Sequence, residues 1–159
     1  MIKVLGIDPG LAATGIAFVV GKGIHIDGYS YGTICTSKEL TIPNRLSYIY
    51  TEISELLLSE IPDIMVVEDV FSLPHYPKSG ILLGQVIGVI LLSASQKHIP
   101  IKQIPVREVK QVLTGYGNAS KIQIERTVCH ILNHYPSIRP YHASDAMALA
   151  ITGLYRYEV

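Results

Sequence analysis

The sequence has few charged residues and few cysteines, and each shortage excludes a class of protein. Charged side chains make up 16% of the 159 residues and hydrophobic ones 48%, which excludes a disordered chain, since disorder needs low hydrophobicity and high charge. Cationic and acidic residues both number 13, so the formal net charge is zero and a generic polycation that coats nucleic acid is excluded. Two cysteines, Cys35 and Cys129, are too few for a disulfide scaffold, so we expect a reducing, cytoplasmic setting.

No signal sequence or membrane segment is expected. The N-terminal run reaches the carboxylate of Asp8 too soon to supply the apolar core of a signal peptide. Residues 79–96 carry no formal charge, but they include three serines and two glutamines and fall short of a span of about 20 apolar residues. We therefore expect a buried helix there, in a single domain covering residues 1–159.

Apolar runs bounded by proline and glycine predict an α/β chain with a five-stranded mixed sheet and helices on both faces. The first three strands are close together in sequence and are expected to form an antiparallel meander. The expected strands are residues 3–7, 14–20, 24–35, 63–69 and 100–104. The expected helices are residues 43–61, 79–98 and 105–114, one capped by Asn118 or Ser120 and ending near residue 132, and residues 142–155.

Three carboxylates occupy places where such a sheet gathers reactive groups. Asp8 ends the first strand, Glu68 ends the apolar strand at 63–69, and Asp145 is expected in the first turn of the last helix. If the two strands are neighbours, Asp8 and Glu68 converge at their carboxyl ends. His142 lies three residues before Asp145 and so falls on nearly the same helix face.

A cluster of carboxylates is tolerated when hard divalent cations offset the repulsion. Two such ions about 4 Å apart can activate water and stabilise a leaving oxygen in phosphodiester cleavage, and an imidazole could ligate a metal or take a proton. Taken singly, Asp8 also suits a turn, Asp145 a helix N-terminus and His142 a cap or a surface position. Glu68 follows four apolar residues and needs a partner in either case.

Seven sequence blocks, in order, resemble the RuvC family of Holliday junction resolvases over about residues 2–152. They are Gly6-Ile7-Asp8-Pro9-Gly10, Thr14-Gly15, Glu68-Asp69-Val70-Phe71, Leu83-Gly84-Gln85, Val109-Lys110-Gln111, residues 115–121 (GYGNASK) and residues 145–150 (DAMALA). The resemblance implies a ribonuclease H-like fold and a homodimer that cuts opposed strands of a four-way DNA junction with Mg²⁺ or Mn²⁺. A RuvAB-type branch-migration complex is a further partner suggested by the family.

By the same resemblance, Asp8, Glu68 and Asp145 correspond to catalytic acids, and His142 stands where many members have a fourth acid. The implied roles place Asp8 between two metals, Glu68 on the metal that activates water and Asp145 on the leaving-group side. His142 would be a ligand or a proton acceptor.

The family also implies DNA contacts. Phe71 corresponds to an aromatic that stacks on bases, and Lys110 and Lys121 correspond to basic contact positions; Lys78 and Arg107 are expected contacts as well. Residues 97–126 hold six cations and two carboxylates, a local net charge of +4, so a neutral chain can still present a positive face to phosphate. A core position for Phe71 and a solvated face for the lysines are the alternatives.

The sequence leaves three other functional interpretations open. An actin-like ATPase shares the opening Gly-Ile-Asp-x-Gly pattern but needs about twice this length. A catalytically weak or inactive junction-binding module is one alternative, and a related nuclease for other branched nucleic acids is another. Val86 and Ile87 stand where the family commonly has alanine and arginine, which puts DNA affinity in question.

Gly80, Gly84 and Gly88 fall on one helical stripe, suited either to a dimer interface or to tight packing within the chain.

Overall fold

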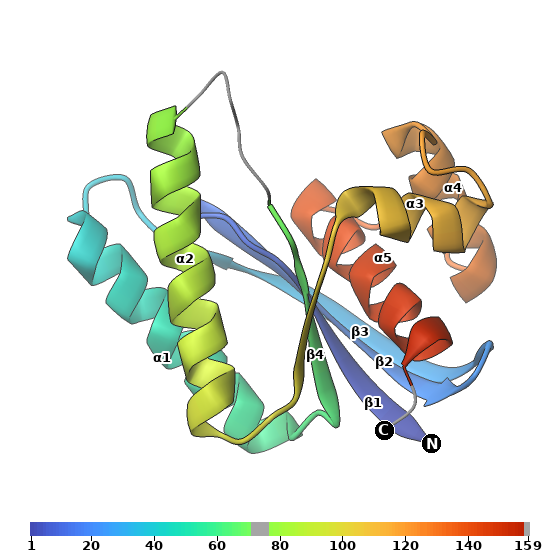
Figure 1. Ribbon diagram of the computed structural model, residues 1–159, viewed down its shortest axis with the longest axis horizontal. Coiled ribbons are helices and arrows are strands. Elements are labelled where there is room, and N and C mark those ends of the chain that lie inside the picture. Colours follow the sequence, from blue (N-terminus) through green and yellow to red (C-terminus); the bar gives the residue numbers. More distant parts are fainter. Residues whose placement is uncertain (71–76, 158–159) are drawn as a thin grey trace.

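The computed structural model describes residues 1–70 and 77–157 (Figure 1). Its elements follow the order predicted from the sequence. They are β1 (Ile2–Asp8), β2 (Ala13–Lys22), β3 (His25–Cys35), α1 (Ile42–Glu60), β4 (Ile64–Glu68), α2 (Pro77–Gln96), β5 (Ile101–Ile104), α3 (Val106–Thr114), α4 (Lys121–Leu132) and α5 (Tyr141–Arg156).

The strands form one mixed sheet in the order β3-β2-β1-β4-β5. β1, β2 and β3 pair antiparallel, as expected of a meander, whereas β4 runs parallel to β1 and β5 parallel to β4. β4 lies between two parallel neighbours, which explains its continuous run of apolar residues. The parallel arrangement brings the carboxyl ends of β1, β4 and β5 to the same edge of the sheet.

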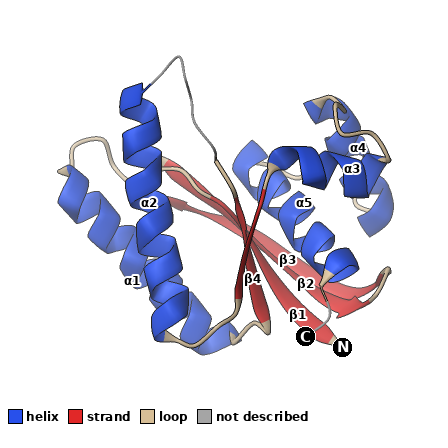
Figure 2. Ribbon diagram, viewed as in Figure 1, coloured by secondary structure: helices blue, strands red, loops and turns tan. Residues whose placement is uncertain are grey.

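Helices cover both faces of this sheet, each over its own hydrophobic core (Figure 2). α1 and α2 pack on one face, where Ile49, Ile53 and Ile90 are fully buried. α3, α4 and α5 cover the other face, where Met147 and Ile151 of α5 are also fully buried. The arrangement is the α/β architecture with helices on both faces that the alternation of strands and helices predicts.

Local side-chain chemistry sets the ends of two helices. Thr41 caps α1 by accepting a hydrogen bond from the Asn44 amide, and proline is tolerated in the first turn that follows. Of the two cap candidates for α4, Ser120 is the cap: its hydroxyl accepts from the Gln123 amide while the Gln123 side chain accepts from the Ser120 amide. This reciprocal pair is a capping box and satisfies two otherwise unpaired amides.

The expectation of a buried helix at residues 79–98 is wrong for one face of α2. Its window Lys78–Gln96 is long and apolar enough to cross a membrane by length and composition alone, and only 22% of that window is buried. Ile81 and Leu92 are 65% and 51% exposed. Tight packing within the chain does not explain the glycines of the stripe either, because a Cβ added at Gly84 or Gly88 would meet nothing within 4 Å.

Candidate active site

Two of the predicted acids lie side by side at the carboxyl edge of the sheet. β1 and β4 are parallel neighbours with Ile7 opposite Val67, so Asp8 and Glu68, the next residue of each strand, end the strands together. Asp8 is only 7% exposed. The predicted convergence of these two carboxylates is therefore confirmed.

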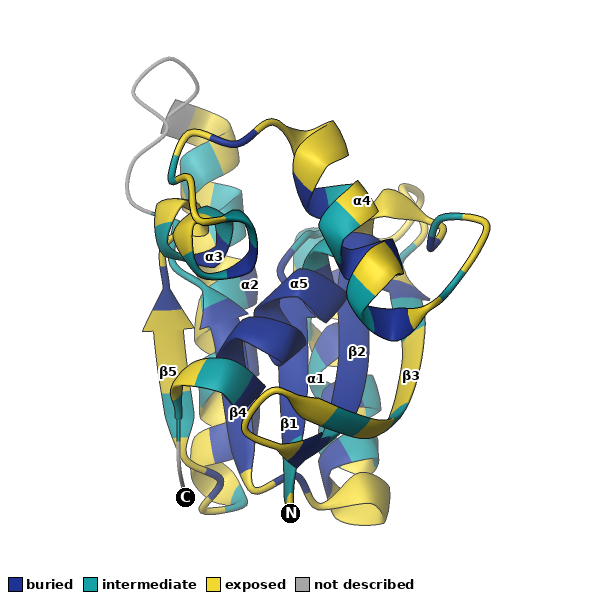
Figure 3. Cartoon of the chain, turned by 90° about the vertical axis from the view of Figure 1, so that its right-hand side faces the viewer, coloured by how far each residue is buried: buried dark blue, intermediate teal, exposed yellow. Residues whose placement is uncertain are grey.

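Small residues let α5 approach the sheet closely enough to complete the cluster. A Cβ added at Gly15 would lie 1.9 Å from the His142 carbonyl oxygen, and one at Gly6 would lie 2.2 Å from that of Ala146. The backbone of α5 thus rests directly on β1 and β2, and the helix is buried along most of its length (Figure 3). Gly6 and Gly15 therefore have a steric function: the absence of a side chain at each lets α5 bring His142 close to Asp8.

His142 and Asp145 reach the acids from α5. The His142 Nδ1 atom lies 2.6 Å from Asp8 Oδ2, so the imidazole is a direct neighbour of the buried carboxylate. Asp145 lies close enough to raise the pKa of both Asp8 and Glu68 by repulsion. α5 begins at Tyr141, so Asp145 lies in its second turn and not, as expected, in the first. A role at the helix N-terminus is therefore not its explanation.

The acidic side chains of the site are too close together and too buried for all of them to hold a negative charge at their ordinary pKa values. Burial raises the pKa of Asp8, while the hydrogen bond with His142 opposes the rise. Burial also raises the pKa of Glu68, to about 7, and repulsion from Asp8 and a hydrogen bond with the Asp8 carboxyl add to the rise. These are the shifts expected of carboxylates that share a site with too little compensating positive charge.

Lys121 supplies part of the missing positive charge. Its Nζ atom donates to Asp145 Oδ2 at 2.8 Å, and this bond raises the pKa of the lysine. The same ammonium lies 5.3 Å from the centre of the Tyr141 ring, whose other neighbour is the Arg139 guanidinium at 4.2 Å. Arg139 is in turn paired with Glu125, so a chain of alternating contacts runs from α4 to the acids.

The chemistry of the donor set fits a hard divalent cation. Carboxylate oxygens and an imidazole nitrogen are suitable ligands for Mg²⁺ or Mn²⁺, and such an ion would relieve the repulsion between Asp8 and Glu68. In the portion of the chain described, no three histidine, cysteine, aspartate or glutamate side chains lie close enough together to hold one ion. Asp145 is bonded to Lys121 instead, so ligation by all the acids requires this ion pair to open.

A cavity of about 270 Å³ adjoins the acids between α3, α4 and α5. Glu68, Asp145, Lys110 and Lys121 are among its lining residues, so it shares two residues with the acidic cluster. The rest of its lining is apolar. The apolar residues are Val106, Val109, Ile124, Ala148 and Leu149.

The loop after Asp8 is anchored by a residue that the sequence analysis missed. Arg45 of α1 is 8% exposed, and its Nε donates to Thr36 Oγ1 at 2.7 Å. Thr36 in turn donates through its hydroxyl to the Leu11 carbonyl and through its amide to the Ala12 carbonyl. These bonds fix the turn that follows Asp8. No signal at the level of sequence spacing links Arg45 to this loop.

The predicted DNA contacts fall into three groups. Lys110 and Lys121 lie beside the acids, as lining residues of the cavity. Lys78 and Arg107 are exposed on α2 and α3 and do not belong to the described lining of that cavity. Phe71 lies outside the described residues.

Comparison with known proteins gives one consistent family. A sequence profile described as crossover junction endodeoxyribonuclease RuvC matches residues 4–153. The chain is 40% identical to the protein of that name from Syntrophomonas wolfei over 157 residues, which cover 99% of this chain and 91% of the relative. It is 37% identical to the one from Thermosipho melanesiensis over 148 residues, covering 93% and 94% of the two chains.

Solved structures show the same likeness. Thermus thermophilus RuvC in complex with a Holliday junction substrate superposes with a TM-score of 0.91 at 28% identity, covering 98% of this chain and 94% of that one. The yeast mitochondrial Holliday junction resolvase shares the fold, with a TM-score of 0.61 at 12% identity over 96% of this chain and 77% of that one.

Proposed function

Since the chain belongs to the RuvC family of crossover junction endodeoxyribonucleases, we propose that Asp8, Glu68, Asp145 and His142 are the side chains with which it cuts four-way DNA junctions. The observation that supports this assignment most directly is the pair of Asp8 and Glu68. The buried carboxyl group of Asp8 and the half-buried one of Glu68 lie together at the carboxyl edge of the sheet, and the pKa of both is raised. A fold does not keep such a repulsive pair for stability, and perturbed acids of this kind gather at functional sites.

The cofactor that we propose is Mg²⁺ or Mn²⁺, with two ions per site. Divalent-metal dependence is a general property of the family. Asp8 is the central ligand in this proposal, because it contacts both Glu68 and His142. A bound cation of this kind supplies Lewis acidity, which lowers the pKa of a ligated water and offsets charge on the leaving oxygen.

The remaining roles belong to the protein's own groups. His142 lies at hydrogen-bonding distance from Asp8 and is exposed on its other side, so it either ligates a metal or holds a proton taken from water. Lys121 is paired with Asp145; if Asp145 served as a ligand of a divalent cation, the Lys121 ammonium would be free to pair with a phosphate oxygen of the DNA. Lys110, which also lines the cavity, holds the neighbouring phosphate. The DNA contacts proposed outside the cavity are Phe71, Lys78 and Arg107.

A homodimer is the assembly that we propose, formed through the exposed face of α2. Ile81, Gly84, Gly88 and Leu92 recur at the spacing of one helical stripe and are all exposed. The stripe carries no charge, and its glycines allow another backbone to approach closely. A second copy of the chain covers this face without requiring a membrane, and two sites in one dimer suit two opposed strands of a junction. A RuvAB-type branch-migration complex remains a prediction from the family, and a cytoplasmic location remains a prediction from the low number of cysteines.

The function is tested by nicking of a labelled four-way junction by the wild-type protein in Mg²⁺ and in EDTA. A matched linear duplex, a flap and an RNA–DNA hybrid serve as alternative substrates. We expect paired cuts in the junction only, and only with the metal. Cutting of the flap or the hybrid in preference to the junction would favour a nuclease for other branched nucleic acids. Tight junction binding without cutting in either Mg²⁺ or Mn²⁺ would favour a binding module.

A further inference from the structure

We infer that the cavity between α3, α4 and α5 receives one nucleobase of the cut strand, next to the scissile phosphate. This inference rests on the proposed function and assigns one base of the DNA substrate to this cavity. The position of the cavity beside the acids is the first observation that supports it. Glu68 and Asp145 belong both to the acidic cluster and to the lining of the cavity, so a strand whose phosphate lies at the acids has a neighbouring nucleotide at the opening of the cavity.

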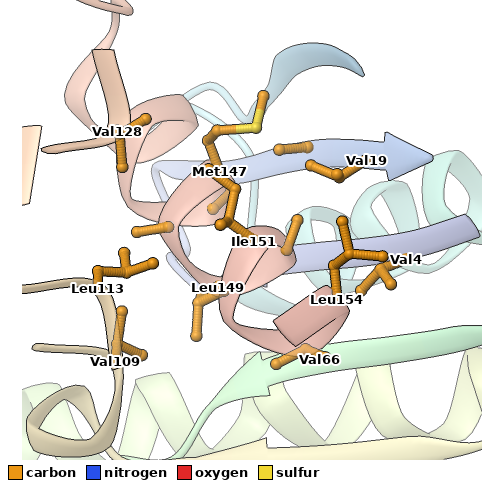
Figure 4. Close-up of a cluster of buried hydrophobic side chains, with 14 of the residues drawn as sticks. Val4, Val19, Val66, Val109, Leu113, Val128, Met147, Leu149, Ile151 and Leu154 are labelled. Atoms are coloured by element: carbon orange, nitrogen blue, oxygen red, sulfur yellow. The ribbon is translucent and has the colours of Figure 1, made fainter. Parts of the chain in front are cut away.

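The walls of the cavity suit a flat apolar group. Val109 is 4% exposed, Leu149 3% and Ile124 9%, so these side chains form its buried part. Val109 of α3 and Leu149 of α5 belong to the same core cluster on this side of the sheet, and both are labelled in its close-up (Figure 4). Small-molecule sites are concave, mostly apolar and supplied with a few fixed polar groups, and this cavity has that composition.

The two lysines at the cavity favour a nucleotide, which carries a phosphate, over a purely apolar ligand. Lys110 of α3 and Lys121 of α4 both line the cavity, together with the acids Glu68 and Asp145. A polynucleotide is the ligand that carries anionic phosphates at regular intervals and a flat ring beside each one. The lysines therefore match the backbone, and the apolar walls match the ring. Enzymes that do chemistry on a base show that an unstacked base can be held in a pocket between aromatic and apolar side chains.

The size of the cavity limits its occupant to one ring system. Its volume of about 270 Å³ lies just below the roughly 300–1,000 Å³ of pockets that enclose a drug-sized ligand. A volume of this order suits a single unpaired base better than a dinucleotide. Bases next to the crossover of a four-way junction are easier to unstack than those inside a duplex, which gives this cavity a means to favour some cutting positions over others.

The test combines a filled cavity with a missing base. Ile124→Trp fills the cavity from α4, and junctions with a single abasic site at each position within two nucleotides of the scissile phosphate remove the base but keep the sugar and the phosphate. Single-turnover cutting rates and dissociation constants are measured for each combination. With the wild-type protein we expect one abasic position to lower the cutting rate about tenfold, because the apolar contacts between the base and the cavity walls are lost.

With Ile124→Trp, we expect cutting of the intact junction to fall by a similar factor and the abasic site to have less than a twofold further effect. Ile122→Trp is the matched control, because Ile122 lies on the same helix and is 61% exposed; it should retain the wild-type abasic pattern. If Ile124→Trp unfolds below the assay temperature, Val106→Trp fills the cavity from a residue that is 47% exposed.

Two results would overturn the inference: an abasic effect of equal size in wild-type and filled proteins, or no sensitive position with the wild-type protein. An intact junction that the wild-type protein binds but does not cut would contradict the proposed function instead. In that case the dissociation constants of the intact and abasic junctions still decide whether the cavity holds a base.

Discussion

The pKa of Glu68 shows how strongly the acidity of a single side chain depends on its surroundings. Its pKa is raised to about 7, first by burial and then by repulsion from Asp8. The sequence places Glu68 after four apolar residues, which predicts a half-buried carboxylate in need of a partner. It does not predict that the partner is another carboxylate, because that depends on which strand lies next to β4 in the sheet.

The raised pKa predicts a pH-dependent loss of stability in EDTA. Between about pH 4.5 and 7 the folded protein holds a proton on Glu68 that the unfolded chain has released, so stability falls as the pH rises through this window. Glu68→Gln removes this loss and should raise the free energy of unfolding at pH 8 by roughly 1–3 kcal/mol. Urea unfolding of both proteins in EDTA at pH 8 and pH 5 measures it. Equal stabilities at pH 8 would contradict the assignment.

Tyr141 is predicted to be a positioning residue for Lys121. The lysine ammonium and the Arg139 guanidinium lie over its ring, and such contacts at exposed sites have a free energy of about 0.5–1 kcal/mol. Tyr141→Leu should therefore lower the rate of junction cutting about two- to fivefold, whereas Tyr141→Phe keeps the ring and should match the wild type.

The control for Tyr141 is Tyr48→Leu, at a tyrosine of similar exposure on α1. In a Lys121→Met background, Tyr141→Leu should have no additional effect on the rate. An equal further loss in that background would show that Tyr141 acts by another route.

At the scale of elements, the position of α5 over the sheet depends on Gly15. A Cβ there would lie 1.9 Å from the His142 carbonyl oxygen, so Gly15→Ala must push away the start of α5, together with His142 and Asp145. We expect a loss of about 1–3 kcal/mol in stability and up to about a hundredfold in cutting, since a 1 Å displacement of a reactive group has effects of this size.

Gly28→Ala is the matched control for Gly15→Ala, because a Cβ at Gly28 meets nothing within 4 Å. Thermal unfolding and single-turnover cutting are measured for both variants. A Gly15→Ala protein that cuts at the wild-type rate would show that the close approach of α5 does not position the site.

Elements whose ends carry local signals were predictable from sequence. Pro43, the Ser120 cap and the glycine after α3 mark helix boundaries through their own backbone chemistry, and the continuous apolar run of β4 identifies a strand buried on both faces. The second-turn position of Asp145 was not predicted, since α5 begins at Tyr141 without a side-chain cap. The bond between Lys121 and Asp145 joins residues 24 positions apart, and no local pattern encodes it.

At the scale of the whole molecule, the exposed apolar face of α2 is the feature that a single chain leaves unexplained. The sequence identified the stripe of glycines but could not say whether it faces the sheet or another chain. On one face of α2, Val86 and Ile90 are buried in the core. On the other face, Ile81 and Leu92 remain exposed.

Charged side chains introduced on this face of α2 should dissociate the predicted dimer. The double variant Ile81→Lys, Leu92→Lys places two ammonium groups in an apolar interface, where unpaired charges are strongly disfavoured. Sedimentation velocity should show a dimer for the wild type and a monomer for the double variant, and the monomer should lose paired cuts. Leu58→Lys, at an exposed leucine of α1, is the control. A double variant that still sediments as a dimer would place the interface elsewhere.

The most direct measurement for the site as a whole is single-turnover cutting of a four-way junction by Asp8→Asn at a protein concentration that saturates binding. Asparagine keeps the shape of the side chain and can still bond to His142, but it removes the charge at the centre of the cluster. We predict that the variant binds the junction as tightly as the wild type and makes no detectable cut in Mg²⁺. Cutting by Asp8→Asn at the wild-type rate would contradict the assignment of the nuclease centre to these acids.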